Sequence, residues 1–289
     1  MRSLATVLMW IATTVLLAVA VPAMWAQQNL ISQTGYAALA QRAAADPALQ
    51  SAMADELAAQ VNRLGSRVDP TLVSGIAATY TASSSFPSQF GQANAFAHRW
   101  LFTNTVNSDV DARGRWVIDL KPMLSDAAFT QTLRDYNISL SSAVPIPLTE
   151  NAPATLRPGA LSSYGRLGPW VSWGLAALTA GAALLMLVVA RNRGKALTAL
   201  GVSALLVGAT GWGAIEYAQP HVRAVLDRTS GNVRPVADAM LATAEAGMHQ
   251  WLNVTLIAGG GLVIVGVIVS LLTGLAAASA AGRKRPART

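Results

Sequence analysis

The chain has 289 residues, of which 53% are hydrophobic and only 12% are charged, and its formal net charge is +7. It has no cysteine, which excludes disulfide cross-links and thiolate metal sites. A basic composition is typical of nucleic-acid binding, but here the basic residues flank apolar segments, where they orient helices and meet lipid headgroups. We therefore expect no nucleic-acid partner.

Four apolar segments divide the chain. Each is about 20 residues long with no charge in its middle, the length that a helix needs to cross about 30 Å of hydrocarbon. We predict transmembrane helices at residues 1–26, 170–190, 196–217 and 252–275. The first also resembles a signal peptide, but its long apolar run and Trp25 favour an uncleaved signal anchor.

The charges orient these spans. Arg2, the turn at 191–195 and the tail at 276–289 together hold eight basic residues and no acidic one. Segment 27–169 has as many basic as acidic residues, and segment 216–250, which includes Glu216, has one more acidic than basic residue. The positive-inside rule predicts that both termini are cytoplasmic and that segments 27–169 and 218–251 are extracytoplasmic.

Segment 27–169 begins with helical patterns. An alanine-rich helix is expected over 34–45, and Asp-Pro pairs at 46–47 and 69–70 are typical of helix starts. A fourth helix begins near Phe86 and carries an aromatic face, for which we expect Phe90, Phe96 and Trp100 to be buried.

The later part of the segment is mixed. Residues 115–120 read as a strand and 125–136 as a helix, whereas Pro145 and Pro147 permit only an extended edge over 143–148. The two extended pieces are candidates to pair, and 150–167 reads as an irregular lead into the second span. The predicted fold class is a mainly α membrane protein with a helix-rich α+β extracytoplasmic domain.

Segment 218–251 continues the helical spacing of the neighbouring spans. We predict a helical hairpin that is bent near Pro220, turns near Ser230 and Gly231, and supports the larger domain.

Two parts of the chain carry a resemblance. The first is a helix with Phe86, Phe90, Asn94 and His98, followed by the predicted strand 116–120 and then by Lys121 and Pro122. The second is residues 25–61, which contain the end of the first span and the alanine-rich helix. This arrangement resembles a family of uncharacterised actinobacterial integral membrane proteins, with Phe90 where that family has tryptophan. The resemblance implies one extracytoplasmic domain after the first span and no established reaction. Arginine supplies 18 of the 21 basic residues, which is also typical of a GC-rich bacterial genome.

The polar residues most able to carry chemistry lie in the same region. Asn94 and His98 share a helix face, and Asp119 and Lys121 share a strand face. We expect a structural polar cluster, in which the Asn94 and His98 pair fixes the helix to the Asp119 strand. We expect no bound metal, cofactor or catalytic residue, because a metal site would need ligands from His221 or His249 in the other outer segment.

Glycines in the spans predict close helix packing rather than phosphate binding, since no lysine follows the triple glycine. The expected packing positions are Gly174, Gly181, Gly201, Gly208, Gly259, Gly260 and Gly261. Ser203 and Thr210 are candidates for interhelical hydrogen bonds.

Several functions are disfavoured by what the sequence lacks. It has no Gly-x-Ser-x-Gly motif of the kind that holds a hydrolase nucleophile. A transporter pathway requires ionisable residues in the middle of a span, and these spans have none there. We expect a non-enzymatic protein of the bacterial cell envelope and plasma membrane, whose outer domain binds membrane or envelope proteins as an accessory or scaffold subunit. A membrane sensor or regulator is the alternative, and an outer-leaflet lipid-acting enzyme is a weaker one.

Overall fold

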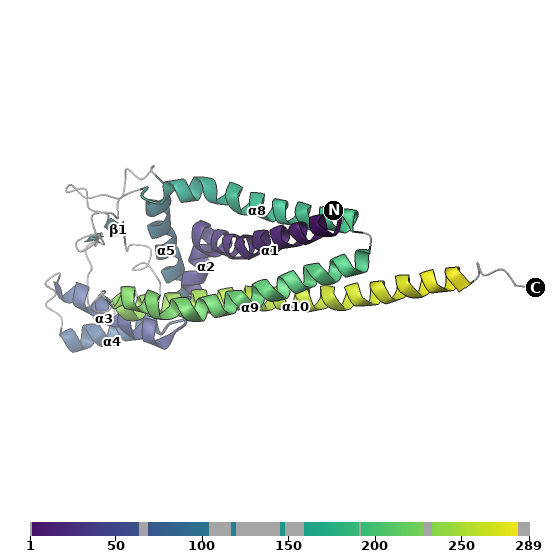
Figure 1. Ribbon diagram of the computed structural model, residues 1–289. Coiled ribbons are helices and arrows are strands. Elements are labelled where there is room, and N and C mark those ends of the chain that lie inside the picture. The colour runs from purple at the N-terminus through teal and green to yellow at the C-terminus, as the bar shows by residue number, and fades with distance from the viewer. Residues whose placement is uncertain are drawn as a thin grey trace, which may run out of the picture. The chain divides into compact units, whose positions relative to one another are not determined.

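The computed structural model describes residues 2–63, 69–103, 117–119, 145–147, 159–190, 192–227 and 233–282. The elements run α1 (Arg2–Ala26), the π-helical turn η1 (Gln27–Ile31), α2 (Gln33–Ala43), α3 (Pro47–Arg63), α4 (Pro70–Thr81), α5 (Phe86–Phe102), β1 (Val117–Asp119), β2 (Pro145–Pro147), α8 (Ser162–Val189), α9 (Arg193–Leu226) and α10 (Val233–Gly282) (Figure 1).

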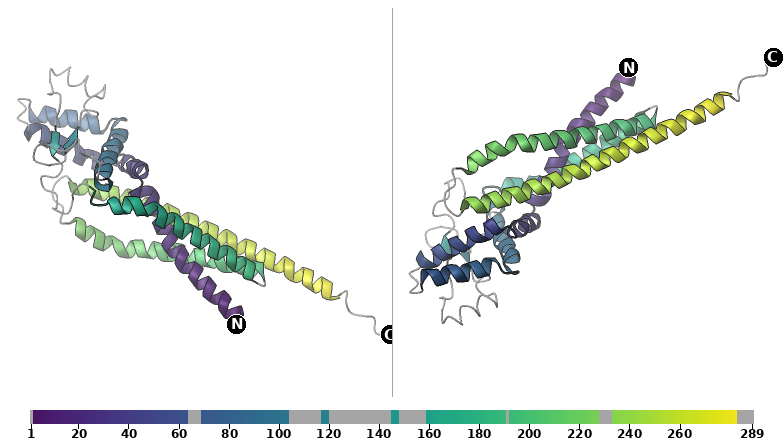
Figure 2. Two further views of the ribbon diagram at one scale, coloured as in Figure 1. Left: turned by 90° about the horizontal axis from the view of Figure 1, so that it is seen from above. Right: turned by 90° about the horizontal axis from the view of Figure 1, so that it is seen from below.

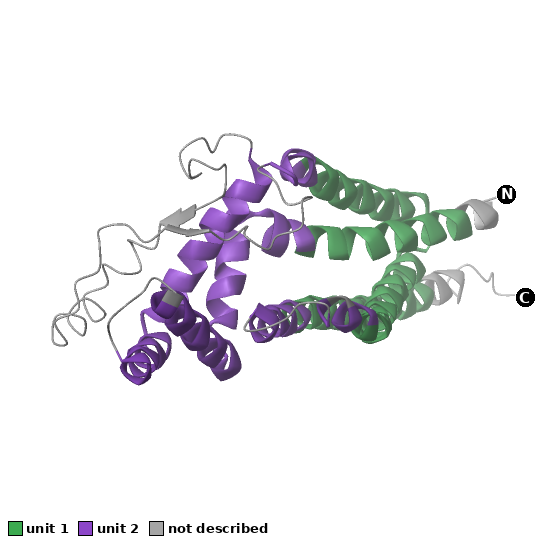
Figure 3. Ribbon diagram, turned by 90° about the vertical axis from the view of Figure 1, so that its left-hand side faces the viewer, with its two compact units in different colours: residues 1–25, 170–220, 246–289 green, residues 26–169, 221–245 purple. Residues whose placement is uncertain are grey.

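The chain forms two compact units, coloured separately in Figure 3. Unit 1 comprises residues 1–25, 170–220 and 246–289, and unit 2 comprises residues 26–169 and 221–245. Helices α1, α8, α9 and α10 are each long and apolar enough to cross a membrane. By length and composition, the chain is therefore a multi-pass membrane protein.

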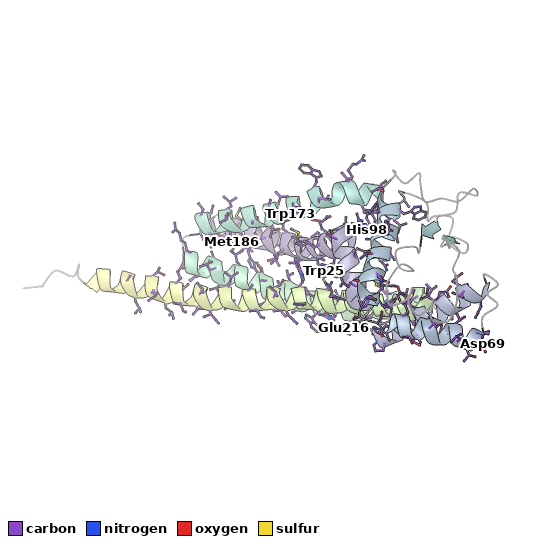
Figure 4. The ribbon with its side chains drawn as sticks, turned by 180° about the vertical axis from the view of Figure 1, so that it is seen from behind. Trp25, Asp69, His98, Trp173, Met186 and Glu216 are labelled. Carbon is purple, nitrogen blue, oxygen red and sulfur yellow. The ribbon has the colours of Figure 1, made fainter. Side chains whose placement is uncertain are left out.

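The helices of unit 2 begin where local capping predicts. The Asp46 carboxylate accepts the backbone N–H of Ala48 at 2.7 Å, and Asp69, labelled in Figure 4, accepts that of Thr71 at 2.8 Å. Each aspartate precedes a proline, which occupies a position where no backbone donor is needed. The four helices predicted over 34–101 are confirmed in type and place.

The core of unit 2 gathers side chains from α2, α3, α4, α5 and the beginning of α10. Phe86 is fully buried at its centre, with the Tyr80 ring at 5.7 Å edge-on and the Phe90 ring at 5.7 Å. Ala239 on α10 belongs to the same cluster, and Val236 and Met240 pack against it. Residues of the segment between the third and fourth spans thus contribute to this core.

Three predictions need correction. Phe96 is 45% exposed although Trp100, four residues on, is buried, because Phe96 lies at the edge of the buried face of α5; the Arg99 guanidinium lies over its ring at 5.2 Å. Helix α8 begins at Ser162, within the segment predicted to be irregular. The prediction of an α+β domain is not supported: β1 and β2 do pair antiparallel, but each has three residues, and the described part of unit 2 is otherwise helical. The helix predicted over 125–136 lies outside the described residues.

In unit 1, helix α1 makes hydrogen bonds to α8 and α9. The Trp10 indole N–H donates to the Ala199 carbonyl on α9 at 2.9 Å, and the hydroxyls of Thr14 and Ser203 lie 2.7 Å apart. The Ser172 hydroxyl on α8 donates to the Ala23 carbonyl at 3.2 Å. Such hydrogen bonds between helices add to packing in lipid, where no water competes. Thr210, the other predicted candidate, bonds to carbonyls of its own helix.

Candidate functional site

His98 is a buried polar side chain of unit 2 with aromatic contacts and a hydrogen bond to a distant element. His98, labelled in Figure 4, is 5% exposed. Its ring stacks on that of Phe102 with centroids 4.1 Å apart and planes 5° apart, and the centroid of the Tyr36 ring lies 5.3 Å away. His98 Nε2 lies 2.9 Å from the Leu30 carbonyl oxygen, so Nε2 carries the proton and donates it. The histidine thereby joins α5 to the π-helical turn that follows α1.

The electrostatics at His98 favour the neutral ring. Burial lowers its pKa below the ordinary value of 6.5, and hydrogen bonds to the backbone of Leu30 and Ile31 offset part of that shift. Burial also raises the pKa of the neighbouring Tyr36 hydroxyl. The site is thus an apolar, hydrogen-bonded joint between two elements far apart in sequence.

Two of the four side chains in the predicted polar cluster are described. The Asn94 amide donates to the Phe90 carbonyl of its own helix at 2.9 Å, and His98 turns to Leu30. Asp119 lies in β1, its side chain is not among those described, and Lys121 lies outside the described residues. Among the described residues, the His98 end of the cluster joins α5 to η1, and the predicted contact with Asp119 and Lys121 lies outside them. No group of three metal-ligating side chains occurs among the residues that the structure describes.

The predicted helix-packing glycines divide into two sets. A Cβ on Gly201 would lie 2.6 Å from the Gly259 carbonyl oxygen, and one on Gly208 would lie 2.5 Å from the Leu256 side chain. A Cβ on Gly259 would in turn meet the Gly201 carbonyl oxygen at 2.9 Å. The other four, Gly174, Gly181, Gly260 and Gly261, have no described atom within 4 Å of such a Cβ, so they do not lie at a close helix contact there.

The close contacts between α9 and α10 have a regular register. Gly194, Gly201 and Gly208 recur every seven residues on α9, opposite Gly266, Gly259 and Leu256 on α10. A seven-residue repeat keeps one seam of each helix facing its partner, and glycine lets the two backbones approach closely. Figures 1 and 2 show α9 and α10 running side by side along this seam.

A polar and aromatic cluster that the sequence analysis missed lies at one end of this seam. The Trp212 indole N–H donates to Asn253 Oδ1 at 3.1 Å, and the His249 ring stacks on the Trp212 ring with centroids 3.8 Å apart. Tryptophan is typical of membrane interfaces, so the position of Trp212 at the end of an apolar run could have indicated this cluster from the sequence.

The length of α9 between its basic end and Trp212 matches the thickness of a membrane. Trp212 follows Arg193 by nineteen residues, and Trp251 precedes Ser270 by nineteen, which is about 28 Å of helix in each case. This matches the hydrocarbon core of a bilayer, about 30 Å thick. We call the end of unit 1 that contains Trp212 and Trp251 its aromatic end. Figure 4 shows Trp25, Trp173 and Glu216 toward this end and Met186 toward the opposite end.

The chain matches no model of a known protein family, no curated protein and no solved structure.

Removing the His98 ring tests its role as a joint. His98→Ala deletes one buried hydrogen bond and the stacking on Phe102, and we expect unit 2 to lose about 1–3 kcal/mol of stability. His98→Gln keeps a side-chain donor and should lose less. Thermal unfolding of the purified protein, followed by circular dichroism at pH 8, measures both changes.

The lowered pKa of His98 also gives a direction for the pH dependence. Its stabilising effect is complete above the ordinary value of 6.5 and is lost as the pH falls through the lower folded-state value. Below pH 6.5, the stability gap between the wild type and His98→Gln should therefore narrow. A gap that widens in acid would contradict the assignment of a neutral, donating ring.

Proposed function

We propose that this chain is a non-enzymatic integral membrane protein of a bacterial plasma membrane. In this proposal it holds a helical domain on the extracytoplasmic side, where that domain binds a partner protein of the cell envelope. The chain would act as an accessory or scaffold subunit of an envelope or transport assembly. The resemblance to an actinobacterial membrane family is consistent with this setting.

The distribution of charge in unit 1 is the observation that carries the proposal. Its one carboxylate in sequence is Glu216, at the aromatic end, whereas eight basic residues flank the opposite ends of the spans. This asymmetry favours a cytoplasmic basic end and an extracytoplasmic unit 2. The self-contained core around Phe86 supports a role for unit 2 as a folded binding module rather than a linker.

The hairpin formed by α9 and α10 supports a scaffold role. Arg234 donates to Asp227, which follows α9, at 2.5 Å, and to Asp238 at 2.7 Å, so ionic contacts join the end of α9 to the first turns of α10. Ala239 of the same turns enters the domain core.

Reporter fusions test the orientation. Alkaline phosphatase, active only outside the cytoplasm, should be active when fused at residues 60, 140 or 235 and inactive at residues 193 or 286. Green fluorescent protein should give the inverse pattern. Phosphatase activity at residue 193 together with none at residue 60 would reverse the assignment.

Affinity purification in mild detergent, followed by mass spectrometry, tests the scaffold role. We expect a membrane or envelope protein to co-purify. If it binds the outer domain, its recovery should rise when intact cells are first treated with a membrane-impermeant cross-linker. A protein that purifies alone under several detergents, with its domain folded, would argue against an accessory subunit.

A further inference from the structure

The chain passes between its two units four times, and each crossing is helical. The crossings lie at residues 25–26, 169–170, 220–221 and 245–246. The first is at the end of α1, which continues directly into η1, and the other three lie inside α8, α9 and α10. Figure 3 shows the two units in different colours. Any movement of one unit against the other must therefore bend these helices.

Three of the four crossings carry a proline inside the helix. Pro22 lies three residues before the first crossing, and Pro169 and Pro220 lie directly at the second and third. In the helices that the structure describes, every proline beyond the first turn is one of these three. Proline cannot donate to the carbonyl four residues earlier and clashes with it, so helices bend at such positions. The π-helical turn η1 adds a second irregularity at the first crossing.

The fourth crossing carries a glycine that no close contact requires. Gly247 is the second residue of α10 beyond the crossing, and a Cβ there would lie 3.6 Å from Trp25 Nε1, an ordinary contact distance. Gly201, by contrast, lies where a Cβ would meet backbone. Glycine weakens the interior of a helix because its backbone has more conformational freedom to lose. Each of the four helices is thus weakened at the level where it changes units.

The contacts inside each unit are of a different kind. In unit 1, Trp10 bonds to Ala199, Ser172 bonds to Ala23, and the glycine seam holds α9 against α10. In unit 2, the core around Phe86 joins four helices to the beginning of α10. Bending at the crossings leaves all of these contacts intact, whereas bending elsewhere in a unit would break some of them. Movement should therefore concentrate at the crossings.

We propose that Pro22, Pro169, Pro220 and Gly247 form a hinge layer about which unit 2 tilts as a body against unit 1. One weak point in each connecting helix lets all four bend together, as hinge motions between domains require. A change of about 20° in these bends moves a point about 25 Å from the hinge by roughly 9 Å. The hinge layer lets the domain change its angle to the membrane helices while both cores stay folded. This inference does not depend on the partner binding proposed for unit 2.

Distances between spin labels in the full-length protein, reconstituted in lipid nanodiscs, test the proposal. The chain has no cysteine, so labels attach only where one is introduced. Asp55→Cys with Leu184→Cys places one label in each unit at exposed positions. Asp55→Cys with Gln92→Cys reports on unit 2 alone, and Leu184→Cys with Ile268→Cys on unit 1 alone. Double electron–electron resonance then gives the distribution of each distance.

Two sets of four alanine substitutions separate the hinge layer from helix stiffness in general. The hinge variant carries Pro22→Ala, Pro169→Ala, Pro220→Ala and Gly247→Ala. The control variant stiffens spans inside unit 1 at glycines with no described atom within 4 Å of a Cβ, and it carries Gly174→Ala, Gly181→Ala, Gly260→Ala and Gly261→Ala.

In wild type, the distance between units should spread over roughly 9 Å more than either distance within a unit, as expected for bends that vary by about 20°. The hinge variant should lose this excess spread, and the control variant should keep it. Altered distances within a unit would identify a variant that misfolds, and the wild-type comparison then carries the test.

Three results would overturn the proposal. A distance between units as narrow in wild type as the distances within units would show that no tilting occurs. Full spread in a folded hinge variant would place the bending at other residues. Equal narrowing in the control variant would assign the motion to the spans as a whole rather than to the hinge layer.

Discussion

Gly201→Ala is expected to destabilise the paired membrane helices although it adds only one methyl group. The new Cβ would lie 2.6 Å from the Gly259 carbonyl oxygen and 2.7 Å from the Val263 backbone nitrogen. Backbone atoms cannot rotate away, so the helices must separate along the seam. Overpacking of this kind costs about 1–3 kcal/mol, and Gly201→Leu should cost more and reduce the amount of protein in the membrane.

A matched control lies on the other helix of the same pair. A Cβ on Gly261 meets no described atom within 4 Å. Gly261→Ala should therefore be neutral or stabilising, by up to about 1 kcal/mol, because alanine favours the helix over glycine. Thermal unfolding in detergent compares the two. Equal loss of stability in both variants would mean that the glycine seam does not hold the helices together.

Phe86→Ala should be the most damaging single substitution in unit 2. The ring is fully buried between Tyr80 and Phe90, and truncating a buried phenylalanine typically costs about 3–5 kcal/mol. Since a whole domain is stable by only about 5–15 kcal/mol, we expect a large drop in folded protein. Trp100→Ala, at a second buried aromatic position, should act in the same direction.

Phe96→Ala provides the comparison on the same helix. Phe96 is 45% exposed, so its removal leaves little cavity and should change stability by well under half as much. Limited proteolysis of membrane preparations and the yield after detergent extraction measure both. If Phe96→Ala proved as damaging as Phe86→Ala, the orientation of α5 toward the core would be wrong.

The sequence alone predicts the elements that depend on near neighbours. Asp46 with Pro47 and Asp69 with Pro70 mark helix starts, because a cap and the proline's fixed backbone act within three residues. The sequence signal for the four membrane helices is also local, since a run of about 20 apolar residues can be recognised without knowledge of its neighbours in space. The contribution of 218–251 to the larger domain also follows from helical spacing that continues beyond the spans.

Only the tertiary structure decides which way each helix faces. Phe86 and Phe96 are both aromatic residues of α5, yet Phe86 is buried and Phe96 is exposed. The difference arises because the neighbouring helices pack against only one side of α5, and that side becomes its core face. The same holds for Gly201 and Gly261, which differ in whether a second backbone lies opposite. His98 finds its acceptor at Leu30, 68 residues away, in a carbonyl that the π-helical turn presents. Local sequence specifies the helix, whereas its rotation against a distant partner depends on contacts that no short stretch of residues contains.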